Sequence, residues 1–364
     1  MYIKTLKLMN FRNYSGLRLS LSPGLNVFVG DNAQGKTNIL EAVFVSTYAR
    51  SHRTTKDDQL IMNGANESYI GLTAQTNEGE VTVEVKRQRS LPSRFSVDSK
   101  PVKRLGDLMG SINACLFSPE SLSIVKGSPE DRRRFLDMAL SQLHPQYFYR
   151  LVQYNTALKQ RNALLKSDVR DPAQLLMWDA LLASHGAQLM AAREAFVRDL
   201  AQRASRLHLS ITQGKEVLRV SYAPSVEPSD DMERSLLDAL SRCVEDDLRR
   251  GFTTRGPHRD DIALWLNDSD VRFFGSQGQQ RTAALALKLS EVPLVRETRG
   301  DTPVLLLDDV FSELDDARRD ELVKAMSQCQ CLLTCTSVEG LKCMGLPRTK
   351  VFACRGGAVE EMTI

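Results

Sequence analysis

Two short motifs near opposite ends of the chain hold residue types that bind nucleoside triphosphates. The first fits the phosphate-loop pattern G-x-x-x-x-G-K-[ST] and reads Gly30-Asp31-Asn32-Ala33-Gln34-Gly35-Lys36-Thr37. The second is an apolar run at residues 304–307 that ends in two carboxylates, Asp308 and Asp309. We expect the first motif to cradle a triphosphate and the second to hold its magnesium ion. Because most of the chain separates them, the site must be assembled from both ends.

Each position in these motifs has a chemical reason. Glycine lets the backbone N–H groups of the loop converge on phosphate oxygens, and Lys36 adds a positive charge for the β- and γ-phosphates. Thr37 and Asp308 offer oxygen ligands to Mg²⁺, and Asp309 is placed to orient or deprotonate the attacking water. An accidental match in a glycine-rich turn is the alternative. The strand predicted before the loop and the helix predicted after it disfavour that alternative.

A third motif predicts a second phosphate contact at the start of a helix. Its sequence, which follows Gly275, is Ser276-Gln277-Gly278-Gln279. It resembles the serine-glycine-glycine-glutamine signature of the ATP-binding-cassette (ABC) superfamily, with Gln277 in place of the first glycine. An ordinary helix cap is the alternative. In that superfamily the signature of one subunit meets the γ-phosphate held by another, and residues 312–315 resemble its dimer-contact loop.

The elements that must position these motifs are strands and helices in an alternating order. Hydrophobic alternation predicts three strands within residues 1–30 and more strands over 68–105. Helical spacing dominates residues 129–250, with long helices at 173–208 and 231–250 and a short strand at 217–222. Strands and helices alternate again at 262–266, 279–295, 303–307, 317–327 and 332–336, and a hairpin turns at Gly356-Gly357. Asp315 or Asp316 should cap the helix at 317–327.

This order predicts an α/β fold that is split by an insertion. The resemblance of the motifs to the ABC superfamily implies an ABC-type ATPase head, similar to that of SMC proteins. We expect the head to comprise residues 1–125 plus 252–364. The inserted, mainly helical lobe should comprise residues 126–251. A sustained heptad repeat is absent from that insertion, so no long coiled coil is expected.

The composition of the chain limits the class of protein but does not identify a binding partner. The chain is 42% hydrophobic and 26% charged with a net charge of +3, which allows nucleic acid as a partner and does not require it. No apolar run is long enough to cross a bilayer and no signal-peptide pattern opens the chain, so we expect a cytoplasmic protein without a membrane partner. Seven cysteines predict free thiols. We expect Cys329, Cys331 and Cys335 to lie on one buried face of a strand rather than to bind a metal ion.

Basic residues concentrate at residues 86–104. Seven stand against the single acidic Asp98, namely Lys86, Arg87, Arg89, Arg94, Lys100, Lys103 and Arg104. They predict contact with the phosphates of duplex DNA, and a solvated strand face is the alternative. Arginines 132–134 open a helix, where the dipole disfavours positive charge, which favours a functional or interlobe role. His258 could sense nucleotide, tie the lobes together or be a satisfied structural histidine.

Blocks along the whole chain resemble the RecF family of bacterial recombination mediators. They are Phe11-Arg12-Asn13-Tyr14, Ala33-Gln34, residues 117–120, 132–137 and 160–162, and 256–261 followed by 276–279. The resemblance implies an ATP- and Mg²⁺-dependent homodimer that binds double-stranded or gapped DNA. It also implies that Arg12 and Asn13 lie at the nucleotide, and Arg53 resembles an arginine near DNA in SMC heads.

The same resemblance implies a role in DNA damage repair, replication restart and the SOS response. The family works with RecR and RecO to load RecA at gaps and stalled forks, which implies a location at the nucleoid. Two departures predict slow hydrolysis, as in a switch. The strand after the acidic pair ends in Thr334-Cys335-Thr336 where many ABC ATPases have histidine, and Asp309 stands where transporters have glutamate.

Two other functions compete with this one. An ATPase subunit of an ABC transporter would share the three motifs. The long stretch between Thr37 and Ser276 and the basic residues argue against it. A nucleotide-binding scaffold that never hydrolyses ATP is disfavoured only by the acidic pair Asp308-Asp309.

Overall fold

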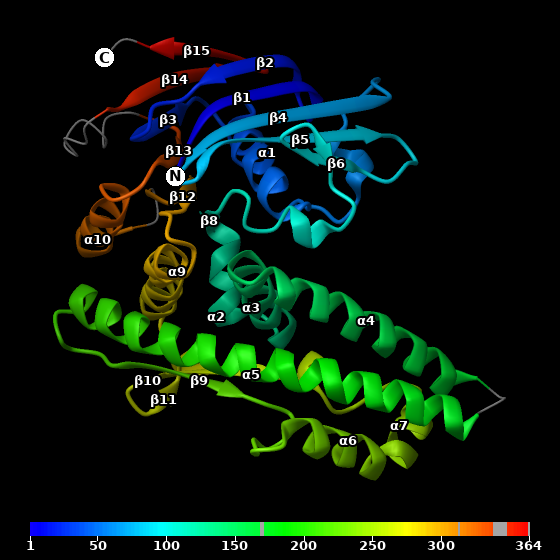
Figure 1. The fold of residues 1–364 in the computed structure, drawn as a ribbon. Coiled ribbons are helices and arrows are strands. Elements are labelled where there is room, and N and C mark those ends of the chain that lie inside the picture. The colour runs from blue at the N-terminus through cyan, green and yellow to red at the C-terminus, as the bar shows by residue number, and fades with distance from the viewer. Residues whose placement is uncertain (168–170, 312–313, 338–347, 363–364) are drawn as a thin grey trace. The chain divides into compact units, whose positions relative to one another are not determined.

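The computed structural model describes residues 1–167, 171–311, 314–337 and 348–362 (Figure 1). By its internal contacts the chain forms two units. Unit 1 comprises Met1–Leu122 and Ala284–Ile364, and unit 2 comprises Ser123–Ala283. Helix α9 (Gln277–Arg299) begins in unit 2 and ends in unit 1.

Unit 1 contains an antiparallel sheet built mainly from the first hundred residues. Its strand order is β2 (Tyr14–Ser20), β1 (Tyr2–Phe11), β4 (Glu67–Thr76), β5 (Gly79–Gln88), β6 (Arg94–Val97) and β7 (Lys100–Pro101). Ile3, Leu6 and Leu8 are all buried although the first two are three positions apart. A register shift between Ile3 and Thr5 explains this, because a bulge adds one residue to the alternation.

The second sheet of unit 1 carries the predicted phosphate loop and acidic pair. Its order is β15 (Ala358–Met362), β14 (Lys350–Arg355), β3 (Leu25–Val29), β13 (Cys331–Cys335), β12 (Val304–Asp308) and β8 (Ala114–Phe117). All neighbours are parallel except the edge pair β14 and β15, which forms the hairpin expected at Gly356-Gly357. Every residue of β12 and β13 is buried, as is usual for parallel strands.

Helix α1 (Lys36–Tyr48) packs against strands of both sheets of unit 1 (Figure 1). It contacts β1, β4 and β5 of the antiparallel sheet and β8, β12 and β13 of the mixed sheet. All its residues from Ile39 to Tyr48 are buried, so it has no polar face. Packing on all sides therefore fixes the helix that follows the phosphate loop.

The remaining described helical elements of unit 1 are short. They are η1 (Asp57–Leu60), η2 (Leu105–Asp107), η3 (Pro119–Leu122) and α10 (Asp316–Met326). The side chain of Asp315 caps α10 by accepting a hydrogen bond from the Arg318 N–H, so one of the two expected capping residues is confirmed.

Unit 2 is mainly helical. Its helices are α2 (Ser123–Lys126), α3 (Pro129–Leu143), α4 (Pro145–Lys166), α5 (Pro172–Ile211), α6 (Met232–Arg242), α7 (Val244–Arg250), η4 (Pro257–Arg259) and α8 (Val271–Phe274). A small antiparallel sheet has the order β11 (Ser269–Asp270), β10 (Asp261–Leu266) and β9 (Leu218–Ala223). The long helix predicted at 173–208 is confirmed by α5, whereas the helix predicted at 231–250 is two helices that meet at Cys243.

The second boundary between the units differs from the sequence-based expectation. We expected the head to resume at residue 252, but residues 252–283 belong to unit 2. The reason is strand pairing, because β10 forms a ladder from Asp261 to Leu266 with β9. Among the described residues, no helix is long and apolar enough to cross a membrane.

Candidate functional site

The phosphate loop of unit 1 lies between β3 and α1, as predicted. Gly30 has φ 158° and Gly35 has φ 107°. A side chain at Gly30 would collide with the carbonyl oxygen of Cys354, and a Cβ at Gly35 would lie 2.5 Å from Asn13 Nδ2. Glycine is therefore required at Gly30 by space, because the contact is with backbone, and at Gly35 by backbone conformation.

Lys36 is buried and turned toward its own loop. Its ammonium group donates hydrogen bonds to the carbonyl oxygens of Gly30 at 2.5 Å and Asp31 at 2.8 Å. Backbone carbonyls are neutral, so the positive charge has no anionic partner in these bonds. A phosphate group would replace these bonds with charge-assisted ones, which are stronger.

The acidic pair meets the phosphate loop through one carboxylate oxygen. Asp308 Oδ1 accepts hydrogen bonds from Thr37 Oγ1 at 2.9 Å and from Thr334 Oγ1 at 2.8 Å. Thr334 stands opposite Asp308 in the β12–β13 ladder, and its hydroxyl also accepts from the Asp309 N–H at 2.9 Å. A carboxylate facing a hydroxyl is the kind of oxygen pair that Mg²⁺ binds, so these residues fit the ion.

Asp309 has an unusual backbone. Its φ of 49° lies in the left-handed region, where non-glycine residues are uncommon and often functional. The hydrogen bond from its N–H to Thr334 holds this conformation. In the sequence, Thr334 was noted only as part of the stretch in which many ABC ATPases have histidine. Its hydroxyl instead fixes both members of the acidic pair.

Asn13 contacts the phosphate loop directly. Its Nδ2 donates to the carbonyl oxygen of Gln34 at 3.2 Å, and its Oδ1 accepts from Asn38 Nδ2 at 2.8 Å. On the other side of the loop, the Gly356 N–H donates to Gln34 Oε1 at 2.6 Å. The first hairpin and the last hairpin of the chain therefore both hold the loop at Gln34.

Arg12 lies one step further from the loop than Asn13. It donates to both carboxylate oxygens of the buried Glu41, at 2.8 and 2.6 Å. Burial raises the pKa of Glu41, but hydrogen bonds from Arg12 and Ser51 and the charge of Arg12 outweigh it and lower the pKa overall. Arg12 thus stabilises the ionised Glu41 beneath the site.

One polar group beside the loop has no partner among the described residues. Tyr14 is fully buried and its hydroxyl makes no hydrogen bond. The oxygen lies 2.7 Å from where a Cβ on Gly35 would be, so it faces the phosphate loop. Buried hydroxyls are nearly always paired, so the unpaired hydroxyl of Tyr14 is an exception that lies beside the phosphate loop.

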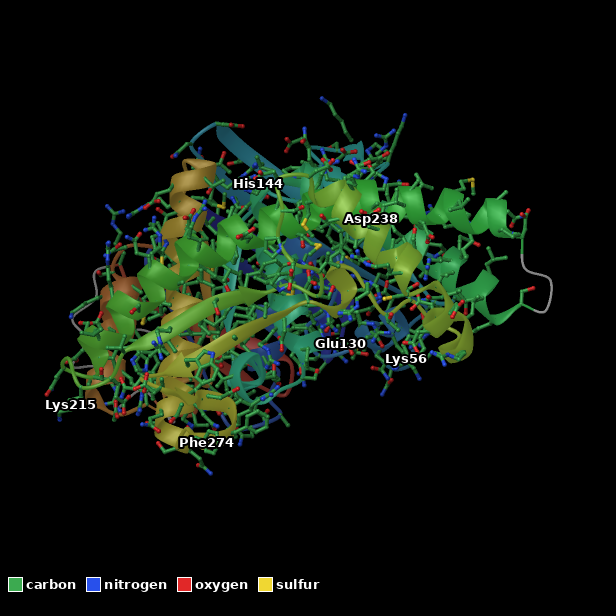
Figure 2. The ribbon with its side chains drawn as sticks, turned by 90° about the horizontal axis from the view of Figure 1, so that it is seen from below. Lys56, Glu130, His144, Lys215, Asp238 and Phe274 are labelled. Atoms are coloured by element: carbon green, nitrogen blue, oxygen red, sulfur yellow. The ribbon has the colours of Figure 1, made fainter. Side chains whose placement is uncertain are left out.

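The signature residues are described within unit 2, where they begin α9. The Ser276 N–H donates to Gln279 Oε1 at 2.8 Å, and the Gln279 N–H donates to Ser276 Oγ at 3.2 Å. This reciprocal pair is a capping box. Ser276 and Gln277 are exposed, as is Phe274, which lies at the surface of its unit (Figure 2). The cap leaves the start of the helix open to solvent, where an anion would be favoured.

The structure separates the four DNA candidates. Arg53 is 40% exposed. It donates a hydrogen bond to Asn38 Oδ1 at 2.9 Å, and Asn38 in turn donates to Asn13, which contacts the phosphate loop. Lys103 is exposed. Arg89 is instead bound to the carbonyl oxygens of Ala65 and Met62, so it stabilises a turn.

The expectation for Arg87 was wrong. Its side chain is buried at 3% exposure, 3.9 Å from Asp57, with the guanidinium near the ring of Phe95. On β5 it shares the inner face with Val83 and Val85, which are also buried. A buried guanidinium on the core face cannot reach DNA as the sheet stands.

Three further predictions from the sequence concern the cysteines near β13, Arg132 and the dimer-contact loop. Cys329 precedes β13 and does not share its face with Cys331 and Cys335, and no metal-binding cluster occurs among the described residues. Arg132 pairs with Asp261 at 2.6 Å inside unit 2. Two residues of the expected dimer-contact loop, Ser312 and Glu313, lie outside the described residues.

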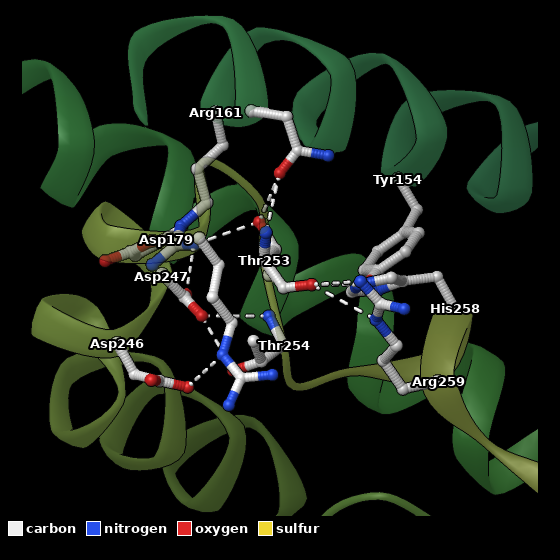
Figure 3. Close-up of polar contacts among 11 residues, drawn as sticks. Tyr154, Arg161, Asp179, Asp246, Asp247, Thr253, Thr254, His258 and Arg259 are labelled. Atoms are coloured by element: carbon white, nitrogen blue, oxygen red, sulfur yellow. Dashed lines mark hydrogen bonds and ion pairs between the residues drawn. The ribbon is translucent and has the colours of Figure 1, made fainter. Parts of the chain in front are cut away.

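His258 is a partly buried, structural histidine of unit 2. Its Nδ1 pairs with the Tyr154 hydroxyl at 2.6 Å and its Nε2 with the Thr253 carbonyl oxygen at 3.0 Å (Figure 3). Desolvation, with the positive charges of Arg259 and Arg133, lowers the pKa of His258 to about 4, although the hydrogen bond to Thr253 opposes the shift. The ring is therefore neutral near pH 7.

Comparisons with known proteins agree with this geometry. Residues 2–350 match the family model of the RecF/RecN/SMC N terminal domain. The chain is 39% identical to the "DNA replication and repair protein RecF" of Clostridium perfringens, over 99% of this chain and 100% of that protein. It is 40% identical to the protein of the same name in Lachnoclostridium phytofermentans, with the same coverage.

Solved structures give the same answer. The structure of the "recombination mediator protein RecF-ATP in RecFOR pathway" superposes with a TM-score of 0.92 and 33% identity, over 100% of this chain and 98% of that one. An Smc head domain from Pyrococcus furiosus matches with a TM-score of 0.59 and 16% identity, over 100% and 96%, which shows a shared fold.

The fold and the site define an ABC-type ATPase with the head architecture of SMC proteins. Within that class, the chain belongs to the RecF family. The alternative of a transporter subunit is not favoured, because relatives with the RecF name match from end to end.

Proposed function

We propose that this chain is an ATP-dependent switch that binds double-stranded or gapped DNA during recombinational repair and replication restart. The observation that carries the ATP-dependent part is the contact of Thr37 with Asp308, which joins the two nucleotide motifs. The names of the relatives, DNA replication and repair proteins, support the DNA part. A similar solved structure is that of a RecF protein with ATP in the RecFOR pathway, which supports both parts.

Each site residue of unit 1 has a separate role in binding or hydrolysing ATP. Lys36 leaves the carbonyl oxygens of Gly30 and Asp31 and binds the β- and γ-phosphates. Thr37 and Asp308 hold Mg²⁺, which when bound neutralises charge on the phosphates. Asp309 orients the attacking water and accepts its proton.

A second copy of the chain completes the site. The N-terminus of α9 presents Ser276 at an exposed helix start, which suits the γ-phosphate bound by another copy. ATP then drives dimerisation, and hydrolysis reverses it. The short Asp309 side chain and the absence of a histidine after β13 favour slow turnover.

The partners follow from the same assignment. DNA binds in the ATP state, with Arg53 and Lys103 as contacts in unit 1. RecR binds the complex of this chain with DNA, and RecO and RecA act after it. This role implies a location at the nucleoid in the cytoplasm. The two units serve as the ATPase head and an inserted lobe that carries the signature.

Hydrolysis measured with two variants tests the proposal. Lys36→Met should abolish ATP binding, because no other residue replaces the charge at the phosphates. Asp309→Asn should keep ATP binding and lose turnover. Equal turnover by the wild type and Asp309→Asn would refute the role of Asp309, and ATP binding by Lys36→Met at wild-type affinity would refute the site.

A further inference from the structure

Several arginines of unit 2 fall into two groups. The first group is buried, and carboxylates neutralise the charges of its arginines. Arg161 bonds Asp179 at 2.5 Å and Asp247 at 2.6 Å (Figure 3). Arg193 bonds Asp137 at 2.7 Å. These ion pairs, with that of Arg132, are internal to the unit, so their charges are not available to a partner.

A second group of arginines bonds to neutral oxygens. Arg133 donates to the carbonyl oxygen of Asp260 at 2.8 Å, and Arg255 to that of Ser225 at 3.0 Å. Arg259 donates twice to the carbonyl oxygen of Thr253, at 3.2 and 3.0 Å. Within the described part of the chain none of the three forms an ion pair. A hydrogen bond fixes the direction of each guanidinium, and the carboxylates of Asp261, Glu130 and Asp137 act on Arg133 only through space.

These charges gather on one loop, residues 251–260, which we call the arginine loop. Arg255 and Arg259 belong to it and are exposed. Arg133 comes to it from α3 through the Asp260 carbonyl. The guanidinium of Arg259 lies 4.8 Å from the centre of the ring of Phe252, which is 36% exposed. Stacked planar groups of this kind also suit contact with nucleotides.

The backbone of the arginine loop is held by part-buried hydrogen bonds (Figure 3). Asp247 Oδ1 accepts from the N–H and the hydroxyl of Thr254, at 2.9 and 2.7 Å. Asn162 Oδ1 accepts from the N–H and the hydroxyl of Thr253, both at 2.8 Å. Since Arg161 in turn holds Asp247, the backbone that carries the exposed arginines is fixed before any ligand arrives. Such preorganisation reduces the entropy lost on binding.

We propose that the arginine loop, with Arg133, contacts the sugar-phosphate backbone of duplex DNA. This inference rests on the proposed function and adds a DNA contact in unit 2, apart from the candidates in unit 1. Arginine forks match phosphate oxygens two at a time, and arginines that form no ion pair on a fixed backbone favour an extended polyanion. Contacts to the backbone carry no sequence information, so the loop adds affinity without base specificity.

The test is binding of the full-length chain, with ATP and Mg²⁺, to a fluorescent duplex over a series of salt concentrations. Arg255→Gln/Arg259→Gln removes two charges but keeps donors for the same carbonyl oxygens. Arg198→Gln is the matched control, since Arg198 is also in unit 2 and its side chain is 76% exposed. Arg255→Lys/Arg259→Lys keeps the charge without the planar fork.

The double glutamine variant should bind duplex about 10-fold more weakly, with a log–log salt slope smaller by about one for each phosphate that is no longer bound. The lysine pair should recover most of that affinity, and the control should match the wild type. Wild-type affinity and slope in the glutamine variant, at unchanged ATP binding and melting temperature, would overturn the inference. If the wild type itself bound no duplex, the DNA part of the proposed function would fail together with the inference.

Discussion

Thr37 Oγ1 and Asp308 Oδ1 lie 2.9 Å apart, although 271 positions separate the two residues in sequence. The parallel order β3–β13–β12 explains the contact, because the carboxyl ends of these strands meet at one edge of the sheet. The phosphate loop follows one of these strands and the acidic pair ends another. The contact between the two motifs of the proposed nucleotide site therefore follows from the fold of unit 1.

Thr334 should matter more for turnover than for ATP affinity. Thr334→Val removes a donor to Asp308 and the acceptor for the Asp309 N–H, both in a buried setting. We expect a loss of about 1–3 kcal/mol in the free energy of unfolding. Turnover should fall at least 10-fold, because Asp309 loses its fixed position. Steady-state hydrolysis and urea unfolding measure the two effects. The exposed neighbour Thr336→Val is the control, and equal turnover in both variants would contradict the assignment.

Tyr14→Phe should separate stability from function. Removing a buried hydroxyl that has no partner should leave the nucleotide-free protein as stable or more stable, by up to about 1 kcal/mol. If the hydroxyl bonds to the loop in its ATP-bound conformation, ATP affinity should fall several-fold. Calorimetric titration and thermal melting without nucleotide check the pair of effects. A variant that is less stable and binds ATP normally would show that the hydroxyl serves only the fold.

The lowered pKa of His258 predicts that the stability of the folded chain depends on pH. Its pKa is about 4 in the folded chain, against an ordinary value of 6.5, so the unfolded chain binds the extra proton between these values. Stability should therefore fall as the pH is lowered from 6.5 towards 4, by at most about 1.4 kcal/mol per pH unit from this group. His258→Gln should show a smaller slope in urea unfolding over that window. Identical slopes would mean that His258 has the same pKa in the folded and the unfolded chain.

Arg161→Met should destabilise unit 2 strongly. The change leaves Asp179 and Asp247 buried without their shared partner, which costs about 3–5 kcal/mol in comparable sites. Chemical unfolding of the variant measures the loss, and Arg198→Met at an exposed position of α5 is the control. A loss below about 1 kcal/mol, the value of a surface ion pair, would show that water reaches the cluster.

The sequence was most informative where residue type and spacing alone define the chemistry. The phosphate loop and the acidic pair needed only a glycine pattern and a strand end. Thr334 could not be assigned in this way, because its contact with Asp308 depends on which strands are neighbours and on their register. The order of the strands is a tertiary property.

Arg87 shows a different kind of failure, one that a local pattern would have prevented. Counting charges over residues 86–104 treated the segment as one surface. Alternation along the strand puts Val83, Val85 and Arg87 on one face and Lys86 on the other. The boundary at residue 252 failed because pairing of β10 with β9 has no signature in either strand alone.

An ATP-dependent DNA switch is tested most simply by sedimentation velocity of the purified chain. The chain is measured first without nucleotide, then with ATP and Mg²⁺, and last with a short duplex added. We predict a dimer that forms only with ATP, binds duplex in that state, and is lost in Lys36→Met but retained in Asp309→Asn. A chain that stays monomeric with ATP, or that binds duplex equally with and without it, would contradict such a switch.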